Sequence, residues 1–411
     1  MSEPLPRGAV FAYGLFGLPL AFVALPIYVH VPHLYSSVFG LSLALVGGVL
    51  LVARLGDAFI DPLIGALSDR WPRRKLALAF ALPALGLGLW GLLRPLGDAP
   101  GALWLAAMLC LVYFGFSLAS VNHNAWGAEL SSDVHERTRI TATREGCGLL
   151  GVVLASVLPG LLAADTRTGM AYLALVFVLL LMACAAVTLG LAPVSAAGRR
   201  DAGAAALWPT LRNRRFARLL GVFACCGIAA AIPASLVLFF IADVLHAEAQ
   251  SGTFLALYFV AAAAGLPGWV WLARRIGKLQ AWLCGMVLAL LVFVWAGFLG
   301  AGEVWAYGAI CVLSGLALGA DLALPPSLLA DVVARERLGA GAAFGWWNFV
   351  TKLNLAVAAG LALPLLQWLG YVPGQGQGLL ALAVVYAGLP ALLKLIAAAL
   401  LWRQRAVIGE V

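Results

Sequence analysis

The chain has 411 residues, of which 64% are hydrophobic and only 11% are charged, and its mean hydropathy is +1.00. Soluble domains carry roughly 25% charged residues, so this composition excludes a soluble globular protein and predicts a polytopic membrane protein. The net charge of +8 does not indicate a nucleic-acid partner, because the basic residues fall in short clusters between long apolar runs.

Apolar runs of about 20 residues are long enough to cross a bilayer as helices. Charge clusters and turn residues divide the chain into runs of this kind. We therefore predict an all-α membrane protein with twelve transmembrane helices, at residues 9–33, 41–68, 76–94, 102–130, 138–163, 169–192, 216–243, 250–273, 279–300, 303–331, 339–366 and 378–402.

The distribution of Lys and Arg predicts the orientation of these spans. Basic clusters follow spans two, four, six, eight, ten and twelve, whereas the loops on the other side hold only Arg94 and Arg167. Cytoplasmic loops are enriched in Lys and Arg, so both termini are predicted to be cytoplasmic. The N-terminus lacks a separate signal peptide, and the first run is therefore predicted to remain as a span of the inner (plasma) membrane.

A polar, arginine-rich connection follows the sixth span and divides the chain into two halves. We predict an N-terminal six-helix bundle at 1–192, a cytoplasmic linker at 193–215 and a C-terminal six-helix bundle at 216–411. A weak repeat supports this division, because Pro62 precedes Asp69 by seven residues as Pro267 precedes Arg274. Two bundles related by parallel repetition are the expected architecture.

The second span contains two carboxylates inside an apolar run. Asp57 and Asp61 are four residues apart and therefore share one face of a helix, with Arg54 one turn earlier. Each acid in hydrocarbon costs about 2.5–3.5 kcal/mol, so we expect this face to meet protein or a water-filled cavity. A plain salt bridge between Arg54 and Asp57 is the structural alternative. When the two halves are aligned with Pro62 opposite Pro267, Ala262 and Leu266 stand opposite Asp57 and Asp61. The second half therefore lacks the acid pair, which assigns cation chemistry to the N-terminal half.

Other polar side chains interrupt later spans. In span four, Asn122, Trp126 and Glu129 follow helical spacing, which predicts that they line a cavity together. His123 is more typical of a structural histidine that bonds a backbone carbonyl. Asp321 precedes Pro325 and Pro326 in span ten, where the prolines should kink the helix. Trp346 offers an aromatic face in span eleven, and Lys394 is close enough to the inner end of span twelve to extend to the membrane surface.

Two groups of residues resemble a known family. Gly65, Asp69, Arg70, Arg73 and Arg74 resemble the loop motif between spans two and three of the major facilitator superfamily, although Pro72 stands where a glycine is common. The pattern Arg54, Asp57, Asp61-Pro62 and Gly65 is similar to the melibiose-permease-like group of glycoside, pentoside and hexuronide cation symporters. Tyr13-Gly14, Arg144, Asp331 and Lys352 extend the resemblance over nearly the whole chain.

The resemblance implies roles for several of these residues. It implies that Asp57 and Asp61 bind the coupling cation, that Lys352 lies near this cation and links the halves, and that Arg144 contacts the substrate. Two departures matter: Pro19 and Asn122 stand where sugar users of the group carry aspartates. Ile60 and Ala119 likewise leave few neutral oxygens for sodium, which favours a proton, since a proton needs only one carboxylate.

These observations predict a cation-coupled secondary transporter of a small organic solute, sugar-like by family, that works by alternating access. Its partners would be the solute, the bilayer and H⁺ or Na⁺, with no cofactor and no metal other than Na⁺ at the acid pair, and it would act as a monomer. Lys352 and Arg54 would form the charge pairs that couple cation to solute. The predicted substrate contacts are Asn122, Trp126, Arg144, Asp321 and Trp346, and the predicted gating motif is Gly65, Asp69, Arg70, Arg73 and Arg74.

Two alternative functions stay open at this point. The apolar face of span one, with Leu18 and Phe22, together with the missing aspartates, fits a transporter of lysolipids or other amphiphiles. A transport-dead membrane sensor or assembly partner is the second alternative, although a retained acid pair argues against it. An enzyme is least favoured, because no nucleophile, base and metal occur together at suitable spacing.

Overall fold

A computed structural model of the protein describes residues 5–70, 73–97, 100–162, 166–194, 207–372 and 374–408. Within these ranges the chain is helical, and the only strand-like feature is an isolated bridge between Val372 and Gln377. The prediction of an all-α protein is confirmed.

The described residues of the first half form nine α-helices and two π-helical turns, at Pro26–His30 and Leu34–Val38, and the second of these turns lies past the predicted end of the first span. The helices are α1 (Arg7–Gly14), α2 (Gly17–Leu25), α3 (Val31–His33), α4 (Leu43–Arg70), α5 (Arg74–Leu93), α6 (Ala102–Glu129), α7 (Val134–Leu162), α8 (Thr166–Leu191) and α9 (Leu207–Arg212).

The second half repeats this pattern of long helices, again with π-helical turns, at Phe240–Val244 and Val384–Gly388, and a short 3₁₀ turn at Glu248–Gln250. Its helices are α10 (Arg214–Phe239), α11 (Ser251–Ile276), α12 (Lys278–Ala296), α13 (Val304–Arg335), α14 (Ala340–Trp368), α15 (Leu379–Ala383) and α16 (Leu389–Ile408).

Twelve helical segments in the described part of the chain are long enough to span a bilayer. Eleven of them contain an apolar stretch long enough to cross a membrane, with α1 and α2 counted as one segment and α15 and α16 as another. The twelfth is α4, which has 28 residues and carries Arg54, Asp57 and Asp61. At 1.5 Å per residue, α4 is about 42 Å long. The predicted set of twelve spans is therefore confirmed.

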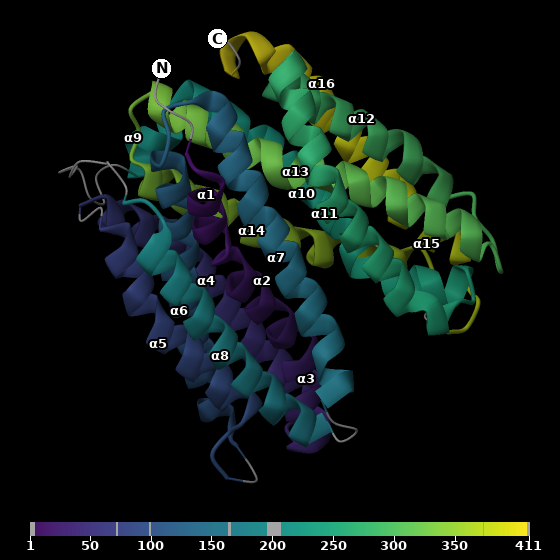
Figure 1. Ribbon diagram of the computed structural model, residues 1–411. Coiled ribbons are helices and arrows are strands. Elements are labelled where there is room, and N and C mark those ends of the chain that lie inside the picture. Colours follow the sequence, from purple (N-terminus) through teal and green to yellow (C-terminus); the bar gives the residue numbers. More distant parts are fainter. Residues whose placement is uncertain are drawn as a thin grey trace. The chain divides into compact units, whose positions relative to one another are not determined.

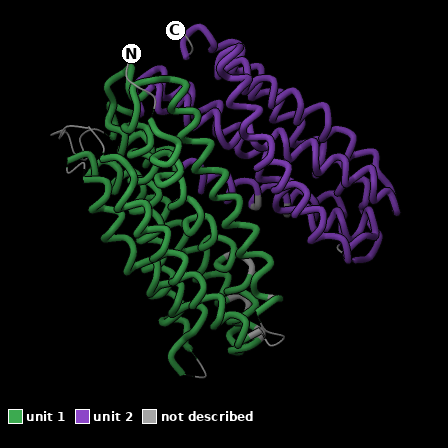
Figure 2. Tube along the Cα trace, in the orientation of Figure 1, with its two compact units in different colours: residues 1–210, 333–349 green, residues 211–332, 350–411 purple. Residues whose placement is uncertain are grey.

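The helices form two compact units (Figures 1 and 2). Unit 1 comprises Met1–Thr210 and Val333–Phe349, and unit 2 comprises Leu211–Val332 and Val350–Val411. The segment Val333–Phe349, which contains the end of α13 and the start of α14, thus packs with the first half of the chain. The predicted linker, 193–215, lies largely outside the described residues, since 195–206 are not described.

Close helix crossings organise the core of unit 1. A Cβ built on Gly17 would lie 2.5 Å from the carbonyl oxygen of Arg144, and one on Gly151 would lie 2.1 Å from that of Leu18. Small residues of this kind let membrane helices touch through their backbones, so α2 and α7 are in direct contact. Phe22 stacks on Phe177 with ring centroids 5.7 Å apart. The apolar face of span one is therefore a packing face of the bundle interior.

Unit 2 has its own core, in which α10 packs along α16 and α11 crosses α13. Where α11 crosses α13, a Cβ on Gly315 would lie 2.3 Å from the carbonyl oxygen of Tyr258. Further along, Phe240 stacks on Tyr386 at 4.2 Å between ring centroids, and the hydroxyls of Tyr307 and Tyr386 are 2.7 Å apart. Each unit thus encloses an independent hydrophobic core.

Candidate functional site

The two acids predicted to bind the cation lie in the second half of α4. Asp57 is 6% exposed and Asp61 is 0% exposed, so protein covers this face of the helix within unit 1. Ser117 Oγ on α6 donates a hydrogen bond to Asp57 Oδ1 over 2.5 Å. The expectation that the acid pair faces a protein interior is confirmed.

Asp61 lies where α4 crosses the first turns of α14. A Cβ on Gly345 would lie 2.6 Å from the carbonyl oxygen of Asp61, and one on Gly65 would lie 2.0 Å from that of Gly341. A larger side chain at any of these glycines would force the two backbones apart. The spacing of Gly341 and Gly345 is the small-xxx-small pattern of membrane helix pairs, and it is a local signal of this crossing.

The two basic residues predicted to act with the acids lie on different helices. Arg54 is one turn before Asp57 on α4, in unit 1, and Lys352 is on α14, in unit 2. Both side chains are partly buried. Their proposed role as counter-charges stays a prediction.

At the Arg70 end of α4, one arginine organises a polar network. Arg74 begins α5 and is 2% exposed. A guanidinium has five N–H donors, and each donor of Arg74 has an acceptor. Nε donates to Glu129 Oε2 at 3.1 Å. Nη1 donates to Ser68 Oγ at 2.6 Å and to Asn122 Oδ1 at 3.2 Å. Nη2 donates to Asp69 Oδ1 at 2.9 Å and to Glu129 Oε1 at 2.6 Å. The network ties the ends of α4 and α6 to the start of α5.

Asp69 extends this network to the first turn of α14. Its Oδ1 accepts the backbone N–H of Gly341 at 2.8 Å, and its Oδ2 accepts that of Ala342 at 2.9 Å. The first N–H groups of a helix have no partner within the helix, and a carboxylate there is favoured by the helix dipole. Asp69 therefore acts as an N-terminal cap supplied from another helix. Arg70 and Arg73, the other charged members of the predicted gating motif, are exposed.

This cap leads to a testable expectation for the segment Val333–Phe349. Asp69→Ala removes both acceptors, and loss of an N-terminal cap costs about 0.5–2 kcal/mol. We expect hydrogen exchange of the amides at Gly341 and Ala342 to accelerate by roughly 3- to 30-fold, measured by mass spectrometry on the purified protein.

A matched control is available on α7, where Asp133 Oδ1 accepts the N–H of Glu136 at 2.8 Å. Asp133→Ala should accelerate exchange at the start of α7 and leave α14 unchanged. Unchanged exchange at Gly341 in Asp69→Ala would show that the cap does not hold this segment.

Two predicted substrate contacts on α6 are engaged elsewhere. Asn122 is buried in the Arg74 network, and Ser68 Oγ also donates to its Oδ1. Trp126 is fully buried, its Nε1–H donates to the carbonyl of Pro193 at 3.0 Å, and its ring lies edge-on to Tyr13. The prediction of a shared cavity face is therefore wrong for Trp126.

His123 fulfils the structural role expected of it. Its Nε2 lies 2.9 Å from the carbonyl oxygen of Tyr13, and the Tyr13 hydroxyl donates to the carbonyl of His123 at 2.8 Å. The two residues thereby join α1 to α6 by a reciprocal pair of bonds.

Arg144 and Trp346 lie at separate positions in unit 1. Arg144, on α7, is 9% exposed and donates to Asn124 and to the carboxylate of Glu145. The Nε1–H of Trp346 donates to the carbonyl of Leu207 at 3.2 Å. Their predicted contact with substrate stays a proposal.

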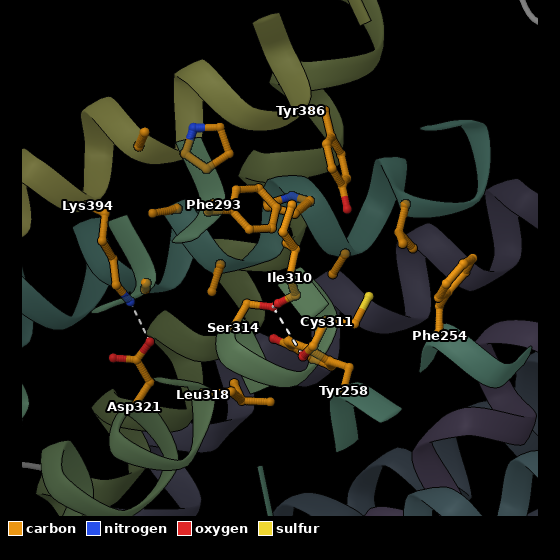
Figure 3. Close-up of a pocket in the computed structure, with 18 of the residues that line it drawn as sticks. Phe254, Tyr258, Phe293, Ile310, Cys311, Ser314, Leu318, Asp321, Tyr386 and Lys394 are labelled. Carbon is orange, nitrogen blue, oxygen red and sulfur yellow. Dashed lines mark hydrogen bonds and ion pairs between the residues drawn. The ribbon is translucent and has the colours of Figure 1, made fainter. Parts of the chain in front are cut away.

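Asp321 is the centre of a second polar cluster, in unit 2 (Figure 3). Trp282 Nε1–H donates to its Oδ1 at 2.9 Å, Cys226 Sγ lies 3.4 Å from the same oxygen, and Lys394 Nζ forms an ion pair with Oδ2. Lys394 is 7% exposed. The prediction that Lys394 extends to the membrane surface is wrong, because Asp321 supplies a buried counter-charge that the spacing within span twelve could not reveal.

The ionic contact at the start of α5 has a counterpart in unit 2. Lys278 begins α12, as Arg74 begins α5, and its Nζ lies 2.5 Å from Asp331 Oδ2 near the end of α13. Asp69 has no acidic counterpart, since α11 ends in Arg274 and Arg275. The repeat therefore preserves a charged contact in each half, while the cap on α14 comes from the first half alone.

Sequence reasoning missed several residues of these clusters. Ser117 gave no signal, because a serine in an apolar span is common and its partner is 60 positions away. Ser120 gave no signal either, although its Oγ accepts a hydrogen bond from Asn348 Nδ2 at 2.8 Å. Only the contact between helices distant in sequence identifies such residues.

The fold and these clusters define a twelve-helix membrane transporter of the major facilitator fold. Among solved structures the chain is similar to a bacterial homologue of the iron transporter ferroportin in an outward-facing state, with a TM-score of 0.73 and 15% identity over 97% of this chain and 99% of that one. It is also similar to the E. coli fucose:proton symporter FucP, with a TM-score of 0.70 and 13% identity over 98% of both chains. These likenesses show the fold alone.

Residues 10–405 match the family described as MFS/sugar transport protein. The chain belongs to this family. It is 28% identical over 162 residues to an isoprimeverose transporter of Lactiplantibacillus pentosus, covering 38% of this chain and 33% of that protein. It is 26% identical over 198 residues to the inner membrane symporter YicJ of Escherichia coli K12, covering 44% and 43%. The alignments thus span less than half of each relative.

Proposed function

We propose that this protein is a cation-coupled secondary transporter of a small organic solute, sugar-like by family, in the inner membrane, with both termini in the cytoplasm. The observation that carries the proposal is the buried acid pair on α4, at 6% and 0% exposure. Burying ionised carboxylates is costly unless a cation or a proton neutralises them. An acid pair retained at this cost fits a site that is loaded and unloaded in each cycle.

The coupling mechanism follows from the same burial. When Asp57 and Asp61 are unloaded, their charge favours a nearby base, for which Lys352 and Arg54 are our candidates. When a cation is bound, the acids are neutralised and no longer attract this base. Coupling requires such a differential interaction, because a ligand shifts an equilibrium only by the difference in its affinity for the two states.

We propose the proton as the coupling cation. Ser117 Oγ donates a hydrogen bond to Asp57, whereas Ile60 and Ala119 offer no side-chain oxygen to a metal ion. Sodium requires several oxygen ligands, whereas a proton needs one carboxylate. Ser117 nevertheless makes sodium the specific second candidate, because the same hydroxyl oxygen could ligate a metal ion if it turned its O–H away.

Asp69 and its contacts supply a gate for alternating access. The carboxylate holds the first turn of α14, and the segment Val333–Phe349 lies in the chain directly before Lys352. Release of this cap would free the segment that directly precedes the proposed coupling lysine in the chain. We therefore propose that Gly65, Asp69 and Arg74 form the closed state of the gate and that Arg70 and Arg73, which are exposed, face the membrane surface or water.

The substrate contacts that we propose are Arg144, by family resemblance, and Asp321 and Trp346, by their polar or aromatic character inside spans ten and eleven. The sugar-type aspartates are absent, and Asn122 and Trp126 are occupied by intramolecular bonds. The amphiphile alternative loses its main support, because Leu18 and Phe22 are 8% and 0% exposed and pack inside unit 1. A sugar-like solute is therefore the preferred substrate class.

Uptake into proteoliposomes tests this function. We expect a panel of labelled pentosides, hexosides and hexuronides to contain a solute that accumulates against its gradient when an inward proton gradient is imposed without sodium. A protonophore should abolish the accumulation. If no gradient of protons or sodium moves any solute while the protein is folded, the sensor alternative replaces the transporter.

The Ser117 hydroxyl decides between the two cations. With proton coupling, Ser117→Ala should retain accumulation without any dependence on sodium. With sodium coupling, the loss of one ligand oxygen should raise the sodium concentration for half-maximal uptake by about tenfold or more, on the scale of a lost hydrogen bond to a charged group. Ser156→Ala is the matched control, because Ser156 is exposed and bonds its own helix at the carbonyl of Val153.

A further inference from the structure

Unit 2 contains a cavity that is separate from the acid pair of α4. Its volume is about 220 Å³, and it lies among α10, α11, α12, α13 and α16, inside a single bundle. Figure 3 shows the ion pair of Asp321 and Lys394 at one side of it and Phe254 and Tyr386 at the opposite side. Tyr307 and Asp321 both line it from α13, and the 14 residues between them correspond to about 21 Å along a helix. The cavity is therefore elongated.

The walls of the cavity are mainly apolar and aromatic. Phe254, Tyr258, Phe259 and Phe293 contribute rings from α11 and α12, and alanines and Pro233 line it from α10. An apolar cavity of about 150 Å³ holds one benzene molecule. A volume of about 220 Å³ therefore fits one aromatic ring with a short apolar substituent, or two fused rings.

Two polar groups at the wall have unused hydrogen-bond capacity. An ammonium group has three N–H donors, and Lys394 uses two of them, on Asp321 and on Cys226 Sγ at 3.0 Å. The third has no acceptor among the residues that the structure describes. The hydroxyl of Tyr258 likewise has no hydrogen-bond partner within the described ranges. An occupant with a hydroxyl or carbonyl oxygen could accept from either group.

The charge of the wall selects a neutral occupant. Asp321 and Lys394 cancel one another, and the Asp321 carboxylate already accepts from Trp282 and Lys394. A further anion would have to be desolvated beside this carboxylate, which is unfavourable in an apolar surrounding. A neutral ligand with one oxygen meets the spare donors without this cost.

The entrance lies along α10. Of the residues that line the cavity, Ala230 and Ala234 are exposed, and both have the smallest side chain after glycine. A large residue at either position would reduce the opening while leaving the buried walls unchanged.

We propose that this cavity is a second ligand site, which binds small neutral aromatic alcohols of the alkylphenol class, with the ring among the aromatic residues and the hydroxyl at Tyr258 and Lys394. The site lies within unit 2 and includes Asp321, which is also one of our proposed substrate contacts, so binding to it is measured without a transport assay.

Equilibrium dialysis of labelled 4-propylphenol against the purified full-length protein tests this site. We expect saturable binding of one molecule per chain. Tyr258→Phe keeps the ring and removes one donor, which should weaken binding by roughly three- to tenfold. Ala234→Trp should abolish saturable binding by closing the entrance. Ala399→Trp is the matched control, because Ala399 is exposed on α16 and does not line the cavity.

Two related probes define the chemistry. Propylbenzene, which lacks the oxygen, should bind more weakly than 4-propylphenol, and 4-propylbenzoate, which adds a negative charge, should bind more weakly still. Equal binding of propylbenzene would assign the cavity to apolar chains and overturn the proposed recognition of a hydroxyl. Tighter binding of the benzoate, wild-type binding by Ala234→Trp, or only non-saturable partitioning would overturn the site itself.

Discussion

Asp61→Asn is expected to abolish accumulation of solute against its gradient while exchange of solute across the membrane persists. Asparagine has nearly the shape of aspartate but cannot be protonated at neutral pH and carries no charge for a cation to neutralise. Because Asp61 is 0% exposed, water cannot easily take the place of the cation or proton at this position. The variant thus resembles the permanently loaded state, which can cycle with solute but cannot use the gradient.

The measurement compares gradient-driven uptake with equilibrium exchange in proteoliposomes containing equal amounts of folded protein. We expect accumulation to fall to the level set by equilibration, which is a complete loss of the gradient-driven component. Asp57→Asn should behave alike, since its amide oxygen can still accept from Ser117.

A control acid is found in unit 2, where Asp243 accepts the hydroxyl of Tyr371 and the N–H of Gly374. The Asp243→Asn substitution changes a loop contact, and proteoliposomes with this variant should accumulate solute as those with the wild type do. Wild-type accumulation by Asp61→Asn would remove Asp61 from the coupling mechanism.

Lys394→Met is expected to lower the free energy of unfolding of the protein substantially. It leaves the partly buried carboxylate of Asp321 without its cation, and breaking a buried ion pair from one side costs up to about 3–5 kcal/mol. Replacing both partners by uncharged residues of similar size is often close to neutral. The double variant Asp321→Asn with Lys394→Met should therefore recover much of the loss.

Unfolding of the purified protein, followed by circular dichroism in increasing denaturant, measures both variants. Lys75→Met is the control, because Lys75 donates to the carbonyl of Leu189 rather than to an acid, and the loss of such a bond costs about 1 kcal/mol. If the double variant is no more stable than Lys394→Met, the ion pair does not account for the effect.

The overall fold could be predicted from the sequence because the bilayer imposes simple rules. The thickness of the hydrocarbon sets the length of an apolar run, and the backbone must satisfy its hydrogen bonds within each helix. Both constraints are local, so twelve spans followed from the runs alone. Even α4, with Arg54, Asp57 and Asp61 in its middle, is predicted as a span because the residues around these three are apolar.

The candidate site could be predicted only in part. The acid pair was evident, since two carboxylates four residues apart in an apolar run are costly and share a face. Their neighbour Ser117 was not, and neither was the cap of Asp69 on α14, whose partners are more than 270 positions away. The interpretation of Lys394 failed for the same reason, because its counter-charge lies 73 positions earlier.

The sequence by itself determined the number and length of the spans, the presence of buried carboxylates on α4 and the family motif around Asp69, because each depends on residues within a few turns of one helix. Only the tertiary structure decided which groups meet: Arg74 with acceptors from α4 and α6, Asp69 with the first turn of α14, and Asp321 with Lys394 beside a cavity. Helical periodicity defines the face on which a side chain lies, whereas its partner depends on which distant helix packs against that face.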